Sequence, residues 1–170
     1  MTLLAIAARA GDRRALDALV VATQRDVWRL CAVLGRRGEA DDLTQETYLR
    51  AIRALPAYRE EAPAAAWLLA IARRVCADDL RRTERRRRLV ERLRLDAVAS
   101  STLPPRSAGT MALLETIDPE RREAFAITQI LGFSYLEAAQ IVGCPVGTIR
   151  SRVARARLEL AELLRQAEAI

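Results

Sequence analysis

The sequence predicts an all-α protein made of two small helical domains joined by a flexible linker. Apolar residues recur at three- and four-residue spacing along most of the chain, and no stretch shows the apolar–polar alternation of a strand. Residues 99–109, ASSTLPPRSAG, are rich in serine, proline and glycine and hold almost no apolar anchor. This linker separates a first domain, residues 1–98, from a second, residues 110–170. An apolar content of 51% over 170 residues supports a hydrophobic core.

Two helices are predicted at the start of the first domain. A short helix over residues 2–10 ends at Gly11, and Asp12 is placed to cap a second helix that Gly35 and Gly38 end. One side of the second helix carries the apolar residues Leu16, Leu19, Val20, Val27, Leu30, Cys31 and Leu34. This side is expected to face the domain core.

An acidic stretch, residues 39–46, opens the next predicted helix. Acidic side chains are favoured at the positive N-terminal end of a helix, so we expect a helix from this stretch to about Ala54, ended by Pro56. A well-charged first turn explains the acids without any partner. A protein-binding surface is the alternative.

A long helix over residues 64–95 is predicted to change character along its length. It begins with the apolar run AAAWLLAIA and ends with ten arginines between residues 73 and 94. This asymmetry predicts that one end is buried in the domain and that the other contacts a polyanion.

The second domain is predicted to begin with two helices, residues 110–116 and 119–131. Asp118 suits the N-cap of the second of these helices, and Pro119 suits its first position.

A helix-turn-helix is predicted over residues 132–157, GFSYLEAAQIVGCPVGTIRSRVARAR. Ser134 and Glu137 form a capping box at the start of its first helix, which Gly143 ends. Pro145 suits the first turn of the second helix, where a missing amide costs nothing.

The second helix of this motif has two different faces. Its buried stripe is predicted to consist of Val146, Ile149, Val153, Ala156, Leu160 and Leu163. At 100° per residue, the residues pointing away from that stripe are Gly147, Thr148, Ser151, Ala154 and Arg155, with Arg150, Arg152 and Arg157 at the flanks. Small outward residues with arginines suit a helix that enters the DNA major groove. A solvated basic face is the alternative.

Composition limits the functions open to the chain. Its 28 basic residues are all arginine and outnumber 22 acidic residues, so the net charge of +6 favours a polyanionic partner. Histidine is absent, and Cys31, Cys76 and Cys144 are too far apart for a CxxC site, so we expect no metal, no cofactor and no enzyme activity. No signal peptide or membrane-spanning segment is apparent, so we expect a cytoplasmic protein.

Three segments in order resemble group IV, or extracytoplasmic-function, sigma factors of bacterial RNA polymerase, in the sigma-70 family. ADDLTQETYLRA, at residues 40–51, resembles the part of sigma region 2 that docks on the polymerase clamp coiled coil. AWLLAIARRVCADDLRR, at residues 66–82, resembles the helix that melts and reads the minus-10 promoter element. DPERREAF, at residues 118–125, together with the helix-turn-helix resembles region 4, which reads the minus-35 element.

The resemblance implies a role for particular residues of each segment. It implies that core polymerase is contacted by Asp42, Gln45, Glu46 and Arg50, while Leu43 and Leu49 stay in the domain core. It implies that the minus-10 strand is contacted by Arg73, Arg74, Asp78, Arg81 and Arg82. It implies that minus-35 bases are contacted by Arg150, Ser151 and Arg155, with Thr148, Arg152 and Arg157 nearer the phosphates.

Two features of region 2 limit what the resemblance implies about base recognition. Many family members have asparagine at the position of Arg74, so a base preference that depends on that amide is not implied here. The loop at residues 56–62 pockets a flipped base in the family, and stacking on Trp67 or Tyr58 would help to hold it. The apolar neighbours of Trp67 favour a core position for that side chain instead.

The partners implied by the resemblance are core RNA polymerase, through its clamp coiled coil and flap, promoter DNA and an anti-sigma factor. One alternative is a response-regulator output domain with a similar helix-turn-helix, which leaves residues 1–98 without a role. A second is a helical adaptor whose basic faces bind an acidic protein. Salt-dependent promoter binding that requires core polymerase would separate these hypotheses.

Overall fold

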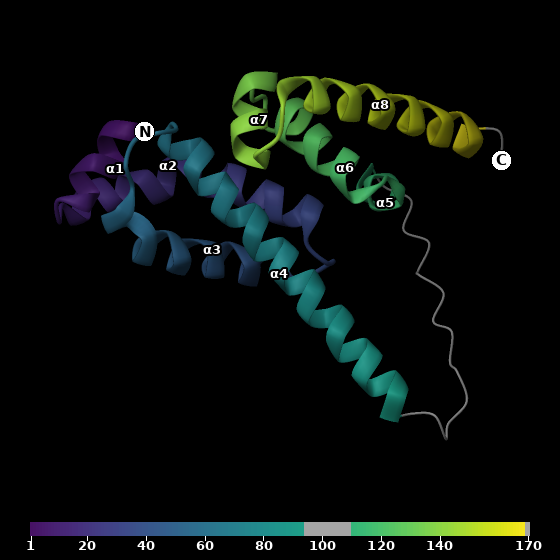
Figure 1. Ribbon diagram of the computed structural model, residues 1–170, viewed down its shortest axis with the longest axis horizontal. Helices are drawn as coiled ribbons and strands as arrows, with labels where there is room; N and C mark the ends of the chain where they lie inside the picture. Colours follow the sequence, from purple (N-terminus) through teal and green to yellow (C-terminus); the bar gives the residue numbers. More distant parts are fainter. Residues whose placement is uncertain (94–109, 169–170) are drawn as a thin grey trace.

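The computed structural model describes residues 1–93 and 110–168, and within these residues all regular secondary structure is helical (Figure 1). The predicted all-α class is confirmed. The expected linker, residues 99–109, lies outside the described residues.

The first group of helices packs around the N-terminal part of one long helix (Figure 1). Its members are α1 (Thr2–Arg9), α2 (Arg13–Leu34), α3 (Ala40–Ala54), a 3₁₀ turn (Leu55–Ala57) and the long helix α4 (Ala64–Leu93). Their shared core includes the fully buried side chains of Val27, Leu30, Leu68 and Leu69. The C-terminal part of α4 extends beyond the other helices of the group (Figure 1).

Local signals at both ends of α2 act as expected. The side chain of Asp12 accepts hydrogen bonds from the amides of Arg14 and Ala15 at 2.8 and 3.1 Å. At the other end, a Cβ on Gly35 would lie 2.3 Å from Cδ1 of Leu43 and 2.6 Å from the carbonyl oxygen of Cys31. Only glycine therefore lets α3 approach the end of α2 so closely.

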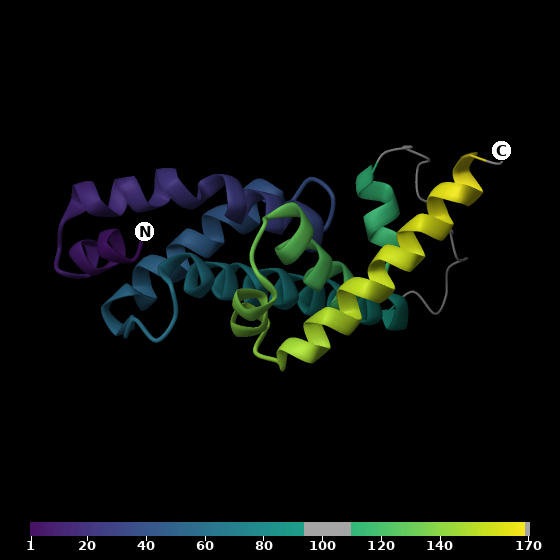
Figure 2. The ribbon, with the colours of Figure 1, turned by 90° about the horizontal axis from the view of Figure 1, so that it is seen from above.

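The second group of helices contains the helix-turn-helix. Its members are α5 (Thr110–Thr116), α6 (Pro119–Phe125), a π-helical segment (Ala126–Ile130), α7 (Tyr135–Val142) and α8 (Val146–Glu168). The long helix α8 packs across α6 and against α7 (Figures 1 and 2). The helix predicted over residues 119–131 is thus α-helical at first and π-helical in its last turn.

The capping box and Gly143 have the predicted geometry, whereas Pro145 lies one residue before α8, which begins at Val146. The Ser134 amide donates to Oε2 of Glu137 at 2.8 Å, and the Glu137 amide donates to Oγ of Ser134 at 3.2 Å, which completes the capping box. Gly143 ends α7 in the left-handed conformation with φ +76°, which a residue with a Cβ adopts at a cost.

The two helix groups contact each other directly. α7 lies against α4, and α6 lies against α2 (Figure 2). Buried side chains of both groups belong to one continuous core, for example Leu34 and Ala72 on one side and Ile117 and Ile127 on the other. The buried Cys31 and Cys76 and the half-buried Cys144 are free thiols.

Candidate nucleic-acid interface

Helix α8 has a buried apolar face and an outer face of small and basic residues. Ile149, Val153 and Ala156 of the predicted buried stripe are almost completely buried, whereas Val146, Leu160 and Leu163 are half-buried. The opposite face exposes Gly147, Ser151, Ala154 and Arg155, with Thr148 half-buried. The sequence therefore placed the two faces of this helix correctly.

The flanking arginines of α8 differ in how they are held. Arg152 is half-buried and donates to the carboxylate of Glu120 on α6, and Nη2 of Arg157 donates to Oε1 of Gln129 at 2.6 Å. Arg150 and Arg155 are exposed. The structure thus sets two arginines against their own domain and directs two others outward.

The predicted minus-10 residues lie on one stretch of α4, but most of them have partners within the protein. Arg81 donates to Asp78 at 2.6 Å and Arg82 to Asp79 at 2.8 Å, each pair one helical turn apart. Both arginine side chains remain more than two-thirds exposed. Exposed ion pairs of this kind are weak, so a phosphate can compete for both arginines.

Asp79 is buried between two arginines. Burial works to raise its pKa, but hydrogen bonds from Arg82 and from Arg36 of the α2–α3 turn outweigh burial and hold that pKa below its ordinary value. The carboxylate therefore stays charged and fixes the orientation of Arg82. Only the spatial arrangement brings Arg36, 43 residues away in sequence, to this carboxylate.

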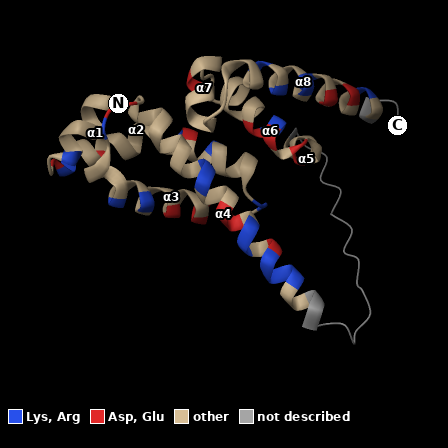
Figure 3. Ribbon diagram, viewed as in Figure 1, with Lys and Arg blue, Asp and Glu red and all other residues tan. Residues whose placement is uncertain are grey.

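Further arginines continue along the free part of α4 (Figure 3). Arg85, Arg86 and Arg87 are exposed there, and Arg88 forms an ion pair with Glu84. These residues were not among the candidate minus-10 contacts. The four-arginine run in the sequence is the signal that could have included them.

Arg73 and Arg74 lie beside the second helix group. Nε of Arg73 donates to Oε1 of the buried Glu123 on α6 at 2.5 Å, while Arg74 is exposed. A groove of about 340 Å³ between α4 and α6 is lined in part by Arg73, Arg74, Arg81, Glu120 and Glu123. Burial raises the pKa of Glu123, against the opposing effect of Arg73. The minus-10 candidates nearest α6 therefore face the second helix group in this arrangement.

The acidic side of α3 contains the polymerase candidates and one unexpected apolar residue. Asp42 and Gln45 are exposed, and Glu46 is half-buried. Leu43 is buried as expected, but Leu49 is 51% exposed, so its expected core position is wrong. Leu49 is six residues, about 120° around the helix, from Leu43, and Thr47 and Ala51 occupy the inward positions instead.

Arg50 points across to α4. Its guanidinium donates to Oε1 of Glu46 and to Oδ2 of Asp78, both at 2.7 Å. Hydrogen bonds from Arg50 and then Arg81 hold the pKa of Asp78 below its ordinary value. Residues assigned from the sequence to two different partners, polymerase and DNA, are therefore bonded to each other.

The loop before α4 is closed around Tyr58. Tyr58 is almost fully buried, its hydroxyl donates to the carbonyl oxygen of Ala62 at 2.7 Å, and its ring centroid lies 5.0 Å from that of Trp67. Stacking of a DNA base on Tyr58 is therefore excluded in this conformation. Trp67 packs against both core clusters, as its apolar neighbours indicated.

Comparison with known proteins identifies the family of the chain. The model of "Sigma-70 region 2" matches residues 19–86, and that of "Sigma-70, region 4" matches residues 110–160. The chain is 47% identical over 161 residues to the ECF RNA polymerase sigma factor SigC of Mycobacterium tuberculosis, an alignment that covers 92% of this chain and 87% of SigC.

Two solved structures share the fold over most of the chain. CnrH, solved in complex with the cytosolic domain of CnrY, is 28% identical with a TM-score of 0.75, and the match covers 97% of each chain. The sigma factor RpoE from Bartonella quintana, solved in complex with the anti-sigma factor NepR, is 27% identical with a TM-score of 0.69. That match covers 88% of this chain and 96% of RpoE.

Two kinds of feature are absent from the described residues. No helix there is long and apolar enough to cross a membrane. No group of three or more histidine, cysteine, aspartate or glutamate side chains in that part of the chain could hold a metal ion. The two family matches and the extended similarity to SigC identify the chain as a member of the extracytoplasmic-function RNA polymerase sigma factors of the sigma-70 family.

Proposed function

We propose that the protein binds core RNA polymerase and directs initiation by reading the minus-10 element with residues 1–98 and the minus-35 element with residues 110–170. The observation that carries this proposal is the placement of two arginine-bearing helices, α4 and α8, in the segments matched by sigma regions 2 and 4. The protein acts by binding and contributes no chemical step of its own.

The outer face of α8 contacts the minus-35 element. Arg150, Ser151 and Arg155 meet base edges, and Thr148, Arg152 and Arg157 lie nearer the phosphates. The exposure of Arg155 between small residues supports this division, because close approach of the helix allows a guanidinium to reach a base. The contacts that tie Arg152 and Arg157 to their own domain support a role in positioning the helix.

Recognition of the minus-10 strand falls to α4. Arg73, Arg74, Asp78, Arg81 and Arg82 contact the opened strand, and the exposed arginines that follow extend the phosphate contacts. A base must leave the stack before a protein can hold it, which costs a few kcal/mol, and several arginine–phosphate contacts together can offset that cost.

DNA binding by Arg73 requires a change in the arrangement of the two helix groups. The Arg73–Glu123 bond and the groove between α4 and α6 leave part of the minus-10 surface covered. We infer that binding of the two groups to separate sites on polymerase moves α6 away from α4. The polymerase thereby sets the spacing of the two DNA-reading surfaces.

Polymerase contacts fall to α3 and to the second helix group. Asp42, Gln45, Glu46 and Arg50 meet the clamp coiled coil, and the exposed Leu49 adds an apolar contact to the same surface. Residues 110–170 meet the flap. The cytoplasm, where polymerase acts, is the expected location.

An anti-sigma factor is a further expected partner. RpoE from Bartonella quintana was solved in complex with the anti-sigma factor NepR, and RpoE shares the fold of this chain over most of its length. This likeness supports the expectation of a dedicated inhibitor for this protein.

Run-off transcription with purified core polymerase on a genomic promoter library tests the proposed function. We expect specific transcripts only when both proteins are present. Tight promoter binding by the protein alone would instead indicate a regulator of the response-regulator type. Binding to an acidic protein without any transcription would indicate a helical adaptor.

A further inference from the structure

Helix α1 lies outside the segment matched by sigma region 2, which begins at residue 19. It packs against the loop that leads into α4. A small core cluster, separate from the main one, joins Ala5 of α1 to Leu55, Tyr58 and Ala64, which flank or belong to that loop. Helix α1 therefore packs against the side of the loop on which Tyr58 is buried.

Polar contacts from α1 reach the loop at three points. The guanidinium of Arg9 donates to the carbonyl oxygen of Tyr58, and its Nη2 lies 3.1 Å from Oε1 of Glu60. The amide of Ala64, at the start of α4, donates to Oγ1 of Thr2 at 3.3 Å. Both ends of the loop and its centre are thus attached to one short helix.

The loop holds a residue in an unfavourable backbone conformation. Glu60 has φ +62°. Among the described residues it is the single non-glycine residue with a positive φ. The left-handed conformation brings a Cβ close to the following carbonyl oxygen, so it persists only when surrounding contacts enforce it. The hydrogen bonds from Arg9 to the Tyr58 carbonyl oxygen and to Glu60, together with the bond from the Tyr58 hydroxyl to the carbonyl oxygen of Ala62, are such contacts.

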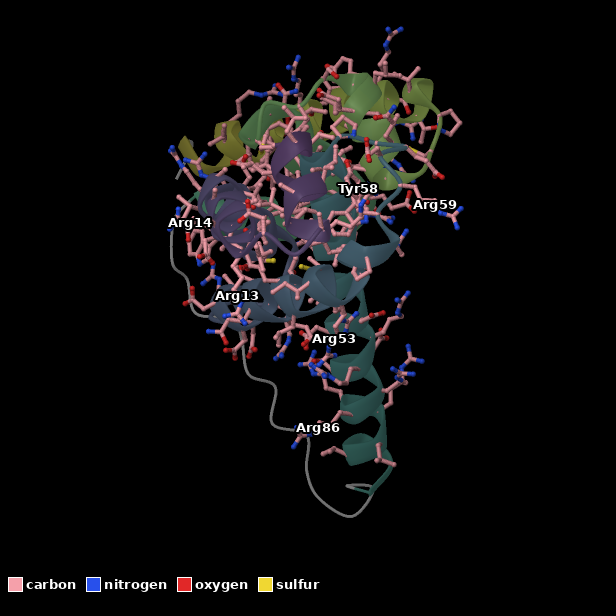
Figure 4. All side chains as sticks on the ribbon, turned by 90° about the vertical axis from the view of Figure 1, so that its left-hand side faces the viewer. Arg13, Arg14, Arg53, Tyr58, Arg59 and Arg86 are labelled. Atoms are coloured by element: carbon pink, nitrogen blue, oxygen red, sulfur yellow. The ribbon has the colours of Figure 1, made fainter. Side chains whose placement is uncertain are left out.

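The outer side of the loop is basic at one position and acidic at the next two. Tyr58 points into the protein, whereas the neighbouring Arg59 reaches into solvent (Figure 4). Glu60 and Glu61 are exposed beside it. Because Arg9 neutralises one of these two carboxylates, a DNA phosphate can approach Arg59 with less repulsion.

We propose that Arg9 is a positioning residue for minus-10 recognition and that α1 holds residues 58–63 in the conformation that meets the opened strand. This inference rests on the proposed minus-10 function of the first helix group. A loop fixed before binding loses less conformational freedom when it meets single-stranded DNA. Arg59, which reaches into solvent from this loop, is then available to a phosphate of the strand.

The test measures base selection by the holoenzyme, assembled from the full chain and core polymerase. The probe is a pool of single-stranded oligonucleotides randomised across the minus-10 element. Arg9→Ala is expected to reduce the enrichment of the preferred base by about tenfold at one or two positions, because small displacements of a binding group reduce its effect strongly. Arg9→Lys, which keeps the charge beside Glu60, should retain most of the enrichment.

Arg13→Ala is the matched control. Arg13 is an exposed arginine at the start of α2, close to α1 in sequence (Figure 4). Its removal should leave base enrichment within about twofold of wild type, because surface substitutions away from a site have small effects. Enrichment by Arg9→Ala equal to that of wild type and of this control would overturn the inference.

A second variant separates positioning from loss of folding. Glu60→Gly removes the ion pair and at the same time accepts the positive φ without strain, so the protein should fold as well as wild type. It should nevertheless lose the same base enrichment as Arg9→Ala. The double variant should lose no more than either single variant, because both act through one loop.

Three outcomes contradict the inference in different ways. Multiplied losses in the double variant would mean that Arg9 does not act through Glu60 and the loop. Equal losses of polymerase affinity and of base enrichment would mean that α1 only stabilises the domain. Failure of the wild-type holoenzyme to select any minus-10 sequence would overturn the proposed function itself, and this inference with it.

Discussion

Arg50 and Asp78 join α3 to α4 through a hydrogen bond of 2.7 Å between Nη1 and Oδ2. Glu46 lies at one end of this connection and Arg81 at the other, so four charged side chains form a row across the two helices. The row connects the proposed polymerase surface to the proposed minus-10 surface. A substitution in it is therefore expected to affect both.

Asp78→Asn tests this connection through its pH dependence. The lowered pKa of Asp78 means that its carboxylate stabilises the fold above the unfolded pKa, near 4, and that this stability is lost as pH falls through the folded pKa. Because the pair is exposed, the free energy of unfolding of the variant should be lower than that of wild type by under about 1 kcal/mol at pH 7. Urea denaturation at pH 7, 5 and 3 should show this difference between variant and wild type shrinking toward zero at the lowest pH. A constant difference would mean that the charge of Asp78 is not involved.

Leu49→Ala should weaken binding to core polymerase about fivefold or more, because an exposed apolar side chain on the same side of α3 as Asp42 is suited to an interface. The free energy of unfolding should change by less than about 0.5 kcal/mol. Val21→Ala, an exposed apolar residue on α2, is the matched control. Fluorescence anisotropy with labelled protein measures the polymerase affinity of each variant. Equal affinities of the two variants would exclude Leu49 from the interface.

Arg155→Ala should relax the preference at one or two minus-35 base pairs, since a bidentate arginine discriminates by about 1 to 3 kcal/mol. Arg152→Ala should lower affinity without changing the preferred sequence, because Arg152 is held against Glu120 on α6. Selection of holoenzyme-bound DNA from a pool randomised over the minus-35 element compares both, with Arg165→Ala near the end of α8 as control. Unchanged selection by Arg155→Ala would remove this face of α8 from base reading.

The double substitution Arg81→Ala and Arg82→Ala should reduce open-complex formation on all promoters alike. It should also lower the salt slope of DNA binding by roughly one to two units, because each arginine displaces counterions from a phosphate. The pair Arg13→Ala and Arg14→Ala, at the start of α2, is the control. A slope equal to wild type would mean that Arg81 and Arg82 stay with Asp78 and Asp79 in the complex.

Arg73→Ala should leave the buried carboxylate of Glu123 without its cation and lower the free energy of unfolding by about 1 to 3 kcal/mol at pH 7.5. The raised pKa of Glu123 means that its neutral form fits the folded state best. Stability linked to this group is therefore complete below the unfolded pKa and lost as pH rises through the folded pKa.

The penalty of Arg73→Ala should accordingly shrink between pH 7.5 and 5, as followed by urea denaturation. Glu123→Gln, which keeps the shape without the charge, should cost less. The double variant Arg73→Ala with Glu123→Gln should lose the added pH dependence. If the penalty of Arg73→Ala stays the same at every pH, the buried charge is not its cause.

Contacts between residues close in sequence could be predicted from the sequence. The Asp12 cap, the Ser134–Glu137 capping box and the left-handed Gly143 each involve residues within four positions of one another, so the local order of residue types decides them. The buried stripe of α8 follows from helical periodicity in the same way. These signals were enough to define the helices and the outer face of the helix-turn-helix.

Only the tertiary structure decided what each charged or aromatic side chain contacts. Arg50 and Asp78 are 28 residues apart, and Arg73 and Glu123 are 50 apart, so their bonds depend on how the helices pack. The exposure of Leu49 and the burial of Tyr58 likewise depend on which helix covers each position. Helical period fixes the angle between side chains on one helix, whereas the angle and distance between helices come from the whole core, which no short segment specifies.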